Sequence, residues 1–352
     1  MKYIKLKDVC KINMGQSPDS SSYNESGEGI PFFQGNADFG DRYPVTRIWC
    51  SEPKKVAQEN DILISVRAPI GAINYSKEKC CIGRGLAALT VDKTKISEKL
   101  LFWVLKAKKE ELNRQGTGST FKAISKKSLE ELLIPQIDIK EQEKDVEILE
   151  KIYMIIQNKH KELKLLTDLI SARFVEMFGD PIRNTQNRPT TKLINVVKMQ
   201  RGFDLPVQDR NQDGNIPVYG ANGVLDSHNT ARIHGGGVIT GRSGTIGKVF
   251  YTEGDYWPLN TSLFSVDKHG NNVIYLAYLL QMFDLTRFVE GTGVPTLNRN
   301  MFHNRQIIDV PINEQNQFAA FVHQINKSKF EVQKSLEKTQ LLFDSLMQEY
   351  FG

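Results

Sequence analysis

The chain has 352 residues, of which 40% are hydrophobic and 25% charged, and its formal net charge is +5. This length suffices for two domains, and the balance is that of a soluble globular protein. No run of about 18 apolar residues could span a membrane, so we expect a cytoplasmic protein, and the four cysteines lack the C-x-x-C spacing of a zinc site.

The first 137 residues contain short runs of β-forming residues separated by glycine, proline and asparagine, such as DILISVRAP at residues 61–69. One longer stretch, residues 96–115, has the periodicity of a helix. We therefore predict a compact α+β domain over residues 1–137. Its 22 basic and 16 acidic residues leave an excess of positive charge, which a phosphate-binding surface would need.

Residues 138–180 follow as a long helix, with neither proline nor glycine between Glu141 and Phe178. Its apolar residues recur at the seven-residue spacing of a coiled coil, and the alternative is an amphipathic helix that lies on its own domain. The predicted seam consists of Leu149, Ile152, Ile156, Leu163, Leu166 and Ile170.

The same order of parts then repeats. Residues 181–312 form a second α+β domain, and residues 313–352 form a second long helix. At about 1.5 Å per residue, neither helix could bury its stripe against a small domain along its whole length, so we expect the two to pair antiparallel as a coiled coil. The second half of that seam consists of Val322, Ile325, Val332, Leu336, Phe343 and Leu346.

The two halves also match residue by residue. Gly116-Thr117-Gly118 recurs as Gly291-Thr292-Gly293, and ILISVRAPIG at 62–71 aligns with GVITGRSGTIG at 237–247, which places Arg67 on Arg242. Such a tandem repeat with two copies predicts a pseudo-two-fold molecule. The four repeated glycines are expected to permit an unusual backbone turn before each helix.

The sequence contains no signature of a catalytic site. TGRSGTIGKV at 240–249 resembles a phosphate-binding loop, but its glycine spacing is wrong and Val249 stands where a magnesium-binding hydroxyl is needed. The six histidines show no metal-binding or catalytic spacing, and no nucleophile elbow is present. We therefore predict no catalytic residue, no metal site and no cofactor in this chain, and a role in recognition.

At this point the sequence resembles the specificity subunit of type I restriction-modification systems. The resemblance is carried by GTGSTFKAISKKSLEELLIP at 116–135, its counterpart GTGVPTLNRNMF at 291–302, and the Glu-Gln pairs at 141–142 and 314–315. The two long helices that follow complete it, so that it covers the whole chain. The second copy departs from the first at Val294-Pro295, where the first copy has Ser119-Thr120.

The resemblance implies a non-catalytic subunit with two target recognition domains separated by the long helices. Each domain would read one half of a bipartite, asymmetric site in double-stranded DNA. The helices would bind two methyltransferase subunits, and restriction or translocase subunits would join the complex. S-adenosylmethionine, ATP and Mg²⁺ would bind to those partners, and no membrane would be involved.

Candidate DNA-binding residues are cations and amides in the predicted loops, since guanidinium groups suit guanine or phosphate and amides suit adenine. An intradomain ion pair is the alternative for Arg67 and Arg242, and a simple tight turn is the alternative for the amides. The candidates are Gln34, Asn36, Arg67, Arg84, Lys122, Arg201, Tyr219, Asn222, Arg242 and Lys248.

Two other functions are compatible with the sequence. The chain could be a DNA-binding regulator that acts alone, although it lacks a helix-turn-helix pattern. It could also be the recognition part of a fused restriction-methylation enzyme whose catalytic region has been separated.

Overall fold

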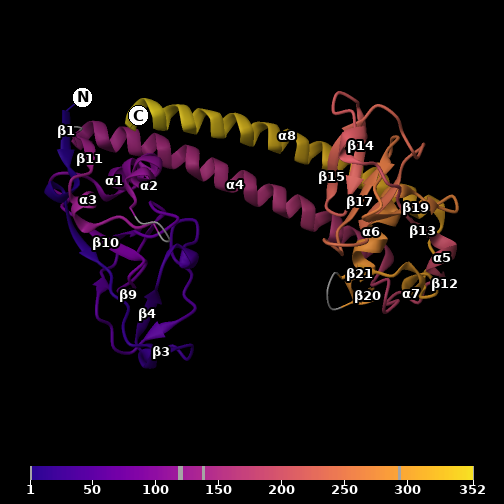
Figure 1. Cartoon of the computed structure of the whole chain (residues 1–352), viewed down its shortest axis with the longest axis horizontal. Coiled ribbons are helices and arrows are strands. Elements are labelled where there is room, and N and C mark those ends of the chain that lie inside the picture. The colour runs from indigo at the N-terminus through magenta and orange to yellow at the C-terminus, as the bar shows by residue number, and fades with distance from the viewer. Residues whose placement is uncertain (1, 118–121, 137–138, 292–294, 352) are drawn as a thin grey trace. The chain divides into compact units, whose positions relative to one another are not determined.

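The computed structural model describes residues 2–117, 122–136, 139–291 and 295–351 (Figure 1). Its contacts divide the chain into two units, of which unit 1 comprises residues 1–158 and 336–352, and unit 2 comprises residues 159–335. This division cuts both long helices, α4 (Ile139–Phe178) and α8 (Ile312–Phe351). Among the described residues no helix combines the length and the apolar character that a membrane span requires.

Unit 1 is built on an antiparallel sheet with the strand order β2-β10-β7-β8. Its two central strands are the most deeply buried, because Leu86–Leu89 and Ile62–Ile64 lose all solvent contact. The strands are β2 (Cys10–Met14), β10 (Leu86–Val91), β7 (Ile62–Ser65) and β8 (Ile73–Tyr75). The predicted run at 61–69 thus contains β7.

Shorter strands complete unit 1. A five-stranded sheet has the order β3-β5-β4-β9-β6, and β1 pairs with β11. Their bounds are β3 (Tyr23–Asn24), β5 (Trp49–Cys50), β4 (Ile30–Phe33), β9 (Cys80–Ile82), β6 (Val56–Ala57), β1 (Lys2–Lys5) and β11 (Leu133–Gln136). All four cysteines are buried and free.

The helix predicted at 96–115 is two helices, α1 (Glu98–Ala107) and α2 (Lys109–Gln115). The single-helix prediction was wrong because the backbone leaves helical geometry at Lys108, with ψ of 9°. Helix α1 begins at Ser97, whose side chain accepts a hydrogen bond from the amide of Leu100 at 3.0 Å. A short helix, α3 (Lys126–Glu130), precedes β11.

Unit 2 has a main sheet with the same topology, in the order β13-β19-β16-β17. Strand β10 in unit 1 and strand β19 in unit 2 each pair antiparallel with both of their neighbours. The strands are β13 (Lys198–Arg201), β19 (Ser262–Asp267), β16 (Gly237–Gly241) and β17 (Val249–Thr252). The mixture of short strands and helices expected for each globular part is confirmed.

The remaining elements of unit 2 are smaller sheets and the helices α5 (Leu193–Val196), α6 (Val273–Phe283) and α7 (Arg299–His303), of which α6 is the longest. Strands β15 (Gly223–His228), β14 (Ile216–Gly220) and β18 (Trp257–Pro258) form one sheet; β12 (Thr190–Lys192) pairs with β22 (Gln306–Ile308), and β20 (Val289–Glu290) with β21 (Thr296–Leu297). Helix α6 supplies seven buried residues to the core.

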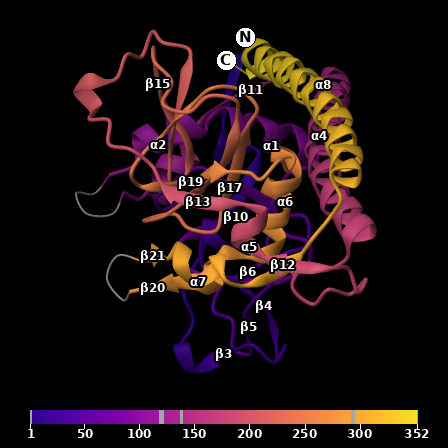
Figure 2. The ribbon, with the colours of Figure 1, turned by 90° about the vertical axis from the view of Figure 1, so that its right-hand side faces the viewer.

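The long helices contact both a globular part and each other. In unit 1, the Tyr153 ring of α4 lies 6.4 Å from the Phe343 ring of α8, and both pack on Trp103 of α1. In unit 2, the Phe174 ring of α4 lies 5.5 Å from the Phe318 ring of α8. Figures 1 and 2 both show, within each unit, a part of α4 beside a part of α8.

The twelve predicted seam residues lie on the covered faces of these helices. Eight are buried, and Leu163, Leu166, Val332 and Leu346 are half-buried. Lys329, which interrupts the apolar row, donates a hydrogen bond to Thr167 Oγ1 of α4 at 2.9 Å. Both kinds of contact that the sequence left open, with the other helix and with a globular part, are therefore present.

The repeated glycines serve different needs. Gly291 has the left-handed φ expected for an unusual turn, +97°. The expectation was wrong for Gly116, whose φ of −63° is ordinary. A Cβ there would lie 2.5 Å from Ile70 Cδ1, so the position requires space rather than a special conformation. Gly118 and Gly293 lie outside the described residues.

Candidate nucleic-acid interface

One end of the unit 1 sheet gathers the loops that carry five of the ten candidate residues. Neighbouring strands run in opposite directions, so β2 and β7 end where β10 and β8 begin. We call this the unit 1 loop end. Arg67 lies two residues after β7, Arg84 lies two residues before β10, and Gln34 directly follows β4.

Backbone hydrogen bonds connect these loops. The amide of Val66 donates to Gly85 O at 2.9 Å, and the amide of Gly85 donates to Gln34 O at 3.2 Å. A side chain at Gly85 would collide with that carbonyl, because its Cβ would lie 2.4 Å from Gln34 O. The glycine therefore permits the close approach that brings Gln34 beside Arg84.

The result is a cleft of about 350 Å³. Gln34, Arg67 and Arg84 are exposed on it, and Asn36 is half-buried. Among the described residues neither arginine forms an ion pair, so the alternative of an intradomain pair finds no support for Arg67 there. The polar lining consists of Gln34, Asn36, Asp38, Ser65, Arg67 and Arg84.

Two polar side chains that sequence reasoning missed shape this cleft. Asp38 Oδ2 accepts hydrogen bonds from the amides of Gln34, at 2.8 Å, and Gly35, at 3.4 Å. Ser65 Oγ donates to Arg67 O at 2.8 Å. Lys122 adjoins them, since its carbonyl accepts a bond from the amide of Ala68 at 3.1 Å. Four predicted residues thus line one cleft, with the fifth next to it.

Unit 2 has an equivalent loop end, where β13 and β16 end and β19 and β17 begin. Arg242 directly follows β16, as its counterpart Arg67 closely follows β7. Its amide donates to Thr261 O at 2.9 Å, and its carbonyl accepts from the amide of Leu297 at 2.8 Å. Arg201 ends β13 and lies 4.0 Å from Asp204.

The unit 2 loop end forms a cleft of about 370 Å³. Predicted residues Arg201 and Arg242 lie on it together with several residues that sequence reasoning did not select. The sequence did signal Asn298, Arg299 and Asn300, because they form the polar LNRN run at 297–300 that follows the second Gly-Thr-Gly. The polar lining consists of Arg201, Arg242, Glu290, Thr296, Asn298, Arg299 and Asn300.

The hairpin formed by β14 and β15 turns at the same loop end. A Cβ on Gly241 would lie 2.8 Å from Ala221 O, so the turn sits directly against the residue before Arg242. Lys248 Nζ donates to Asn222 Oδ1 at 2.8 Å, and both side chains are exposed. The predicted pair Asn222 and Lys248 is therefore in contact.

The prediction for Tyr219 was wrong. Its side chain is only 7% exposed and packs edge-on against Tyr256, with 5.9 Å between the ring centres. Burial also raises the pKa of the Tyr219 phenol. Tyr219 belongs to the core beneath the hairpin, where it cannot reach a base.

A comparison of the sequence with protein families gives the decisive observation. The model of the type I restriction modification DNA specificity domain matches residues 1–167 and again residues 189–341. The chain therefore belongs to this specificity-domain family. The two matches correspond to two copies of the same domain.

Individual relatives agree with the specificity-domain assignment. A putative type I restriction enzyme MjaX specificity subunit of Methanocaldococcus jannaschii is 47% identical over 152 residues, which are 43% of this chain and 36% of that protein. The MjaIX specificity subunit of the same organism is 25% identical over 195 residues, or 52% of this chain and 45% of that protein. The chain thus aligns with less than half the length of either relative.

One solved structure has the same fold over the whole chain. It is the S subunit of a type I restriction-modification system from M. genitalium, with a TM-score of 0.66, 16% identity, and coverage of 100% of this chain and 96% of that chain. At this identity the likeness speaks for the fold of the specificity-domain family and not for individual residues.

Proposed function

We propose that this chain is the DNA sequence-specificity subunit of a type I restriction-modification complex. The observation that carries the proposal is the repeated loop end, because two units of the same topology each present cations and amides around a cleft. Each unit would be a target recognition domain that reads one half of a bipartite, asymmetric site in double-stranded DNA. The ten-residue candidate set, without Tyr219, would supply the contacts.

The long helices have a separate role in this proposal. They would form an antiparallel coiled coil related by a pseudo-two-fold axis, with the twelve seam residues along its interface. Support comes from the burial of these residues and from the contacts that α4 and α8 make within each unit. Exposed apolar residues of α4, including Ile155, Leu165 and Leu169, remain for protein partners.

Those partners would be two methyltransferase subunits, together with restriction or translocase subunits. They would carry the adenine methylation and the ATP-dependent cleavage, and they would bind S-adenosylmethionine, ATP and Mg²⁺. No group of metal-ligating side chains occurs among the residues that the structure describes. The complex would act on host DNA in the cytoplasm.

The proposal is tested by sequencing that detects methylated adenine in host DNA, with and without this gene. Loss of one split motif is expected, and complementation with the intact gene should restore it. An unchanged pattern, with the partner methyltransferase expressed, would contradict the proposal and favour a regulator that binds DNA alone.

The coiled coil also makes a prediction about the site. Deleting one heptad from each helix removes about 10 Å of helix, which corresponds to roughly three base pairs. The unspecified gap in the methylated motif should shorten while both half-sites stay the same. A changed half-site in the same sequencing experiment would count against the helices as the ruler.

A further inference from the structure

The β14–β15 hairpin carries an irregularity at its exposed tip. Val218 pairs with Asp226 and Tyr219 pairs with Val224, so Leu225 has no partner on β14. Such a bulge redirects a side chain, and bulges are frequent beside functional sites. Leu225 is 64% exposed, and its neighbour Val224 is 62% exposed. Two large apolar side chains that are adjacent in sequence are therefore exposed on the hairpin that turns at the unit 2 loop end.

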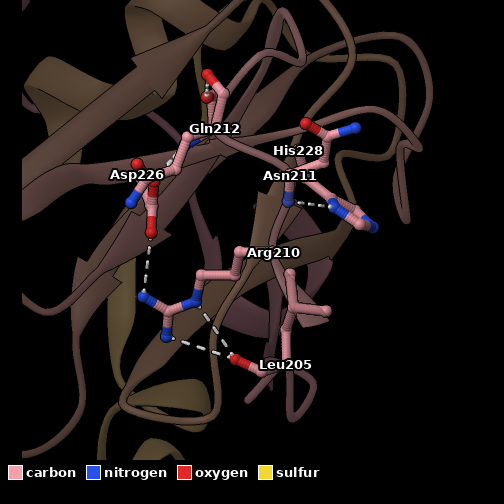
Figure 3. Close-up of polar contacts among 7 residues, drawn as sticks. Leu205, Arg210, Asn211, Gln212, Asp226 and His228 are labelled. Carbon is pink, nitrogen blue, oxygen red and sulfur yellow. Dashed lines mark hydrogen bonds and ion pairs between the residues drawn. The ribbon is translucent and has the colours of Figure 1, made fainter. Parts of the chain in front are cut away.

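The strand beyond the bulge is held firmly (Figure 3). Arg210 donates to Asp226 Oδ2 at 3.3 Å and to Leu205 O at 3.2 Å, and the side chains of Arg210 and Asp226 are only 11% and 14% exposed. Ser227 Oγ donates to Gln212 O at 2.8 Å. Because these bonds fix the hairpin before binding, ordering Leu225 against a ligand costs little entropy.

The turn of the same hairpin presents a hydrogen-bond donor of known orientation. The Lys248 ammonium group can only donate, so the Asn222 atom that it contacts must be Oδ1. Asn222 Nδ2 donates to none of the described residues in the structure. The hairpin thus offers the Nδ2 group of one amide three residues from an apolar side chain, beside the cationic Arg242 loop.

A hydrogen-bond donor next to an apolar side chain matches the edge of one base. In the major groove thymine presents its O4 acceptor next to its C5-methyl group, whereas adenine presents an acceptor next to a donor. A bidentate amide contact with adenine would have to share Asn222 Oδ1 with the Lys248 ammonium group, whereas a contact with thymine needs only Nδ2. We propose that the hairpin reads a thymine, with Asn222 Nδ2 donating to O4 and Leu225, flanked by Val224, packing on the methyl group. The inference rests on the proposed function, in which unit 2 binds one half-site.

The test uses the complex reconstituted with its methyltransferase subunits and a duplex that carries the methylated motif. Each thymine of the unit 2 half-site is replaced in turn by deoxyuridine, which lacks only the methyl group. One replacement should raise Kd about four-fold, as expected for the loss of one buried methyl group. At thymines of the other half-site, the Leu225→Ala variant should show the same ratio of Kd values for the deoxyuridine and thymine duplexes as the intact protein.

Variants locate the contact. Leu225→Ala should bind the thymine and deoxyuridine duplexes equally at that position, and Asn222→Ala should weaken binding to both. Val266→Ala is the matched control, because Val266 is 45% exposed and lies near the end of β19 that is away from the loop end. This variant should keep the four-fold preference for thymine. Leu225 is exposed, so its truncation should leave folding intact.

Several results would overturn the inference and leave the proposed function standing. The first is a unit 2 half-site without thymine on either strand, and the second is unchanged binding by the intact complex after every deoxyuridine replacement. The third is a Leu225→Ala variant that keeps the four-fold preference for thymine but no longer binds the methyltransferase subunits. Failure of the intact complex to bind the motif would instead reject the proposed function itself.

Discussion

The two loop ends belong to sheets of the same topology but differ in how their loops are fixed. In unit 1 the loop that begins at Gln34 is tied to a long helix, because Arg42 forms a two-point ion pair with Glu150 of α4. In unit 2 the hairpin is tied to its own preceding segment through Arg210 and Asp226. The sheets agree because a core tolerates little change, whereas the loops are free to differ, as the proposed reading of two unlike half-sites would require.

The unit 1 brace lies among aromatic rings, although the side chains of Arg42 and Glu150, at 20% and 22% exposed, are less buried than those of Arg210 and Asp226. The Arg42 guanidinium lies 5.2 to 5.7 Å from four aromatic ring centres, those of Tyr75, Phe102, Trp103 and Tyr153. Glu150 also accepts a hydrogen bond from Trp103 Nε1 at 2.9 Å. A disturbance of Arg42 should therefore reach the helix, while a disturbance of Arg210 should stay within the hairpin.

The largest effect is expected from Arg42→Ala. It leaves the Glu150 carboxylate without its cation among aromatic rings, and removal of one partner of such a pair typically costs about 3 kcal/mol. Denaturant unfolding should show this loss, and methylation of the whole motif should fall. Arg47→Ala is the control, since Arg47 lies exposed in the same loop. Equal stability of the two variants would show that the brace is unimportant.

Arg210→Ala should have a smaller and more local effect. The loss of the bonds to Asp226 and Leu205 frees the hairpin, so affinity for the unit 2 half-site should fall roughly tenfold, or about 1.4 kcal/mol. Competition with duplexes mutated in one half-site measures this. The exposed Arg305 provides a control position. A loss at the unit 1 half-site would contradict the local role of this brace.

Arg67→Ala and Arg242→Ala should separate the two units by specificity. Each variant should relax one half-site only, with a loss of roughly tenfold for the loss of one base contact, or a uniform loss across that half-site if the arginine binds phosphate. Binding to duplexes with single substitutions distinguishes these cases. An equal loss at both half-sites from either variant would refute the assignment of one unit to one half-site.

The smallest effect concerns the protonation of a histidine and is confined to unit 2, because unit 1 contains no histidine. His303 Nε2 accepts a hydrogen bond from the amide of Met199 at 3.0 Å, and burial, with Arg299 and Lys198 nearby, lowers the pKa of His303 below 6.5. The unfolded chain therefore takes up this proton first, so stability should fall as pH drops below about 6.5 and level off below the folded pKa.

Thermal unfolding between pH 7 and pH 5 measures this dependence. His303→Gln keeps a neutral acceptor for the Met199 amide and should lose that part of the dependence. If the variant retains the full dependence, another group is responsible.

Local pattern predicted much of this fold. The seven-residue spacing located both long helices to within two residues of α4 and α8, and the β-forming runs located β7 and β16 with an arginine after each. These features depend on residues close together in the sequence. The periodicity of residues 96–115 did not reveal the break at Lys108, since both sides of it continue to bury apolar residues.

The clefts could be predicted only in part. Arg67 and Arg84 were recognisable as loop cations, but nothing near Gln34 in the sequence indicates that its carbonyl meets Gly85. Tyr219 was misplaced because residues 219–223 were taken as one loop, whereas strand β14 reaches Gly220 and the turn is Ala221-Asn222. The partner of Arg42 lies 108 residues away on α4, a separation that no local pattern can bridge.

Unit 1 is formed by two separate segments of the chain, which has a consequence for the synthesis of the protein. Phe343 packs on Trp103 and Tyr153, and it belongs to the segment 336–352 that joins residues 1–158. Translation proceeds at about 5 to 20 residues per second, so roughly ten seconds or more separate the emergence of Trp103 from that of Phe343. Unit 2 is made whole in that interval. We expect the later unit to complete its core first, while the earlier one waits on the ribosome with an exposed aromatic surface.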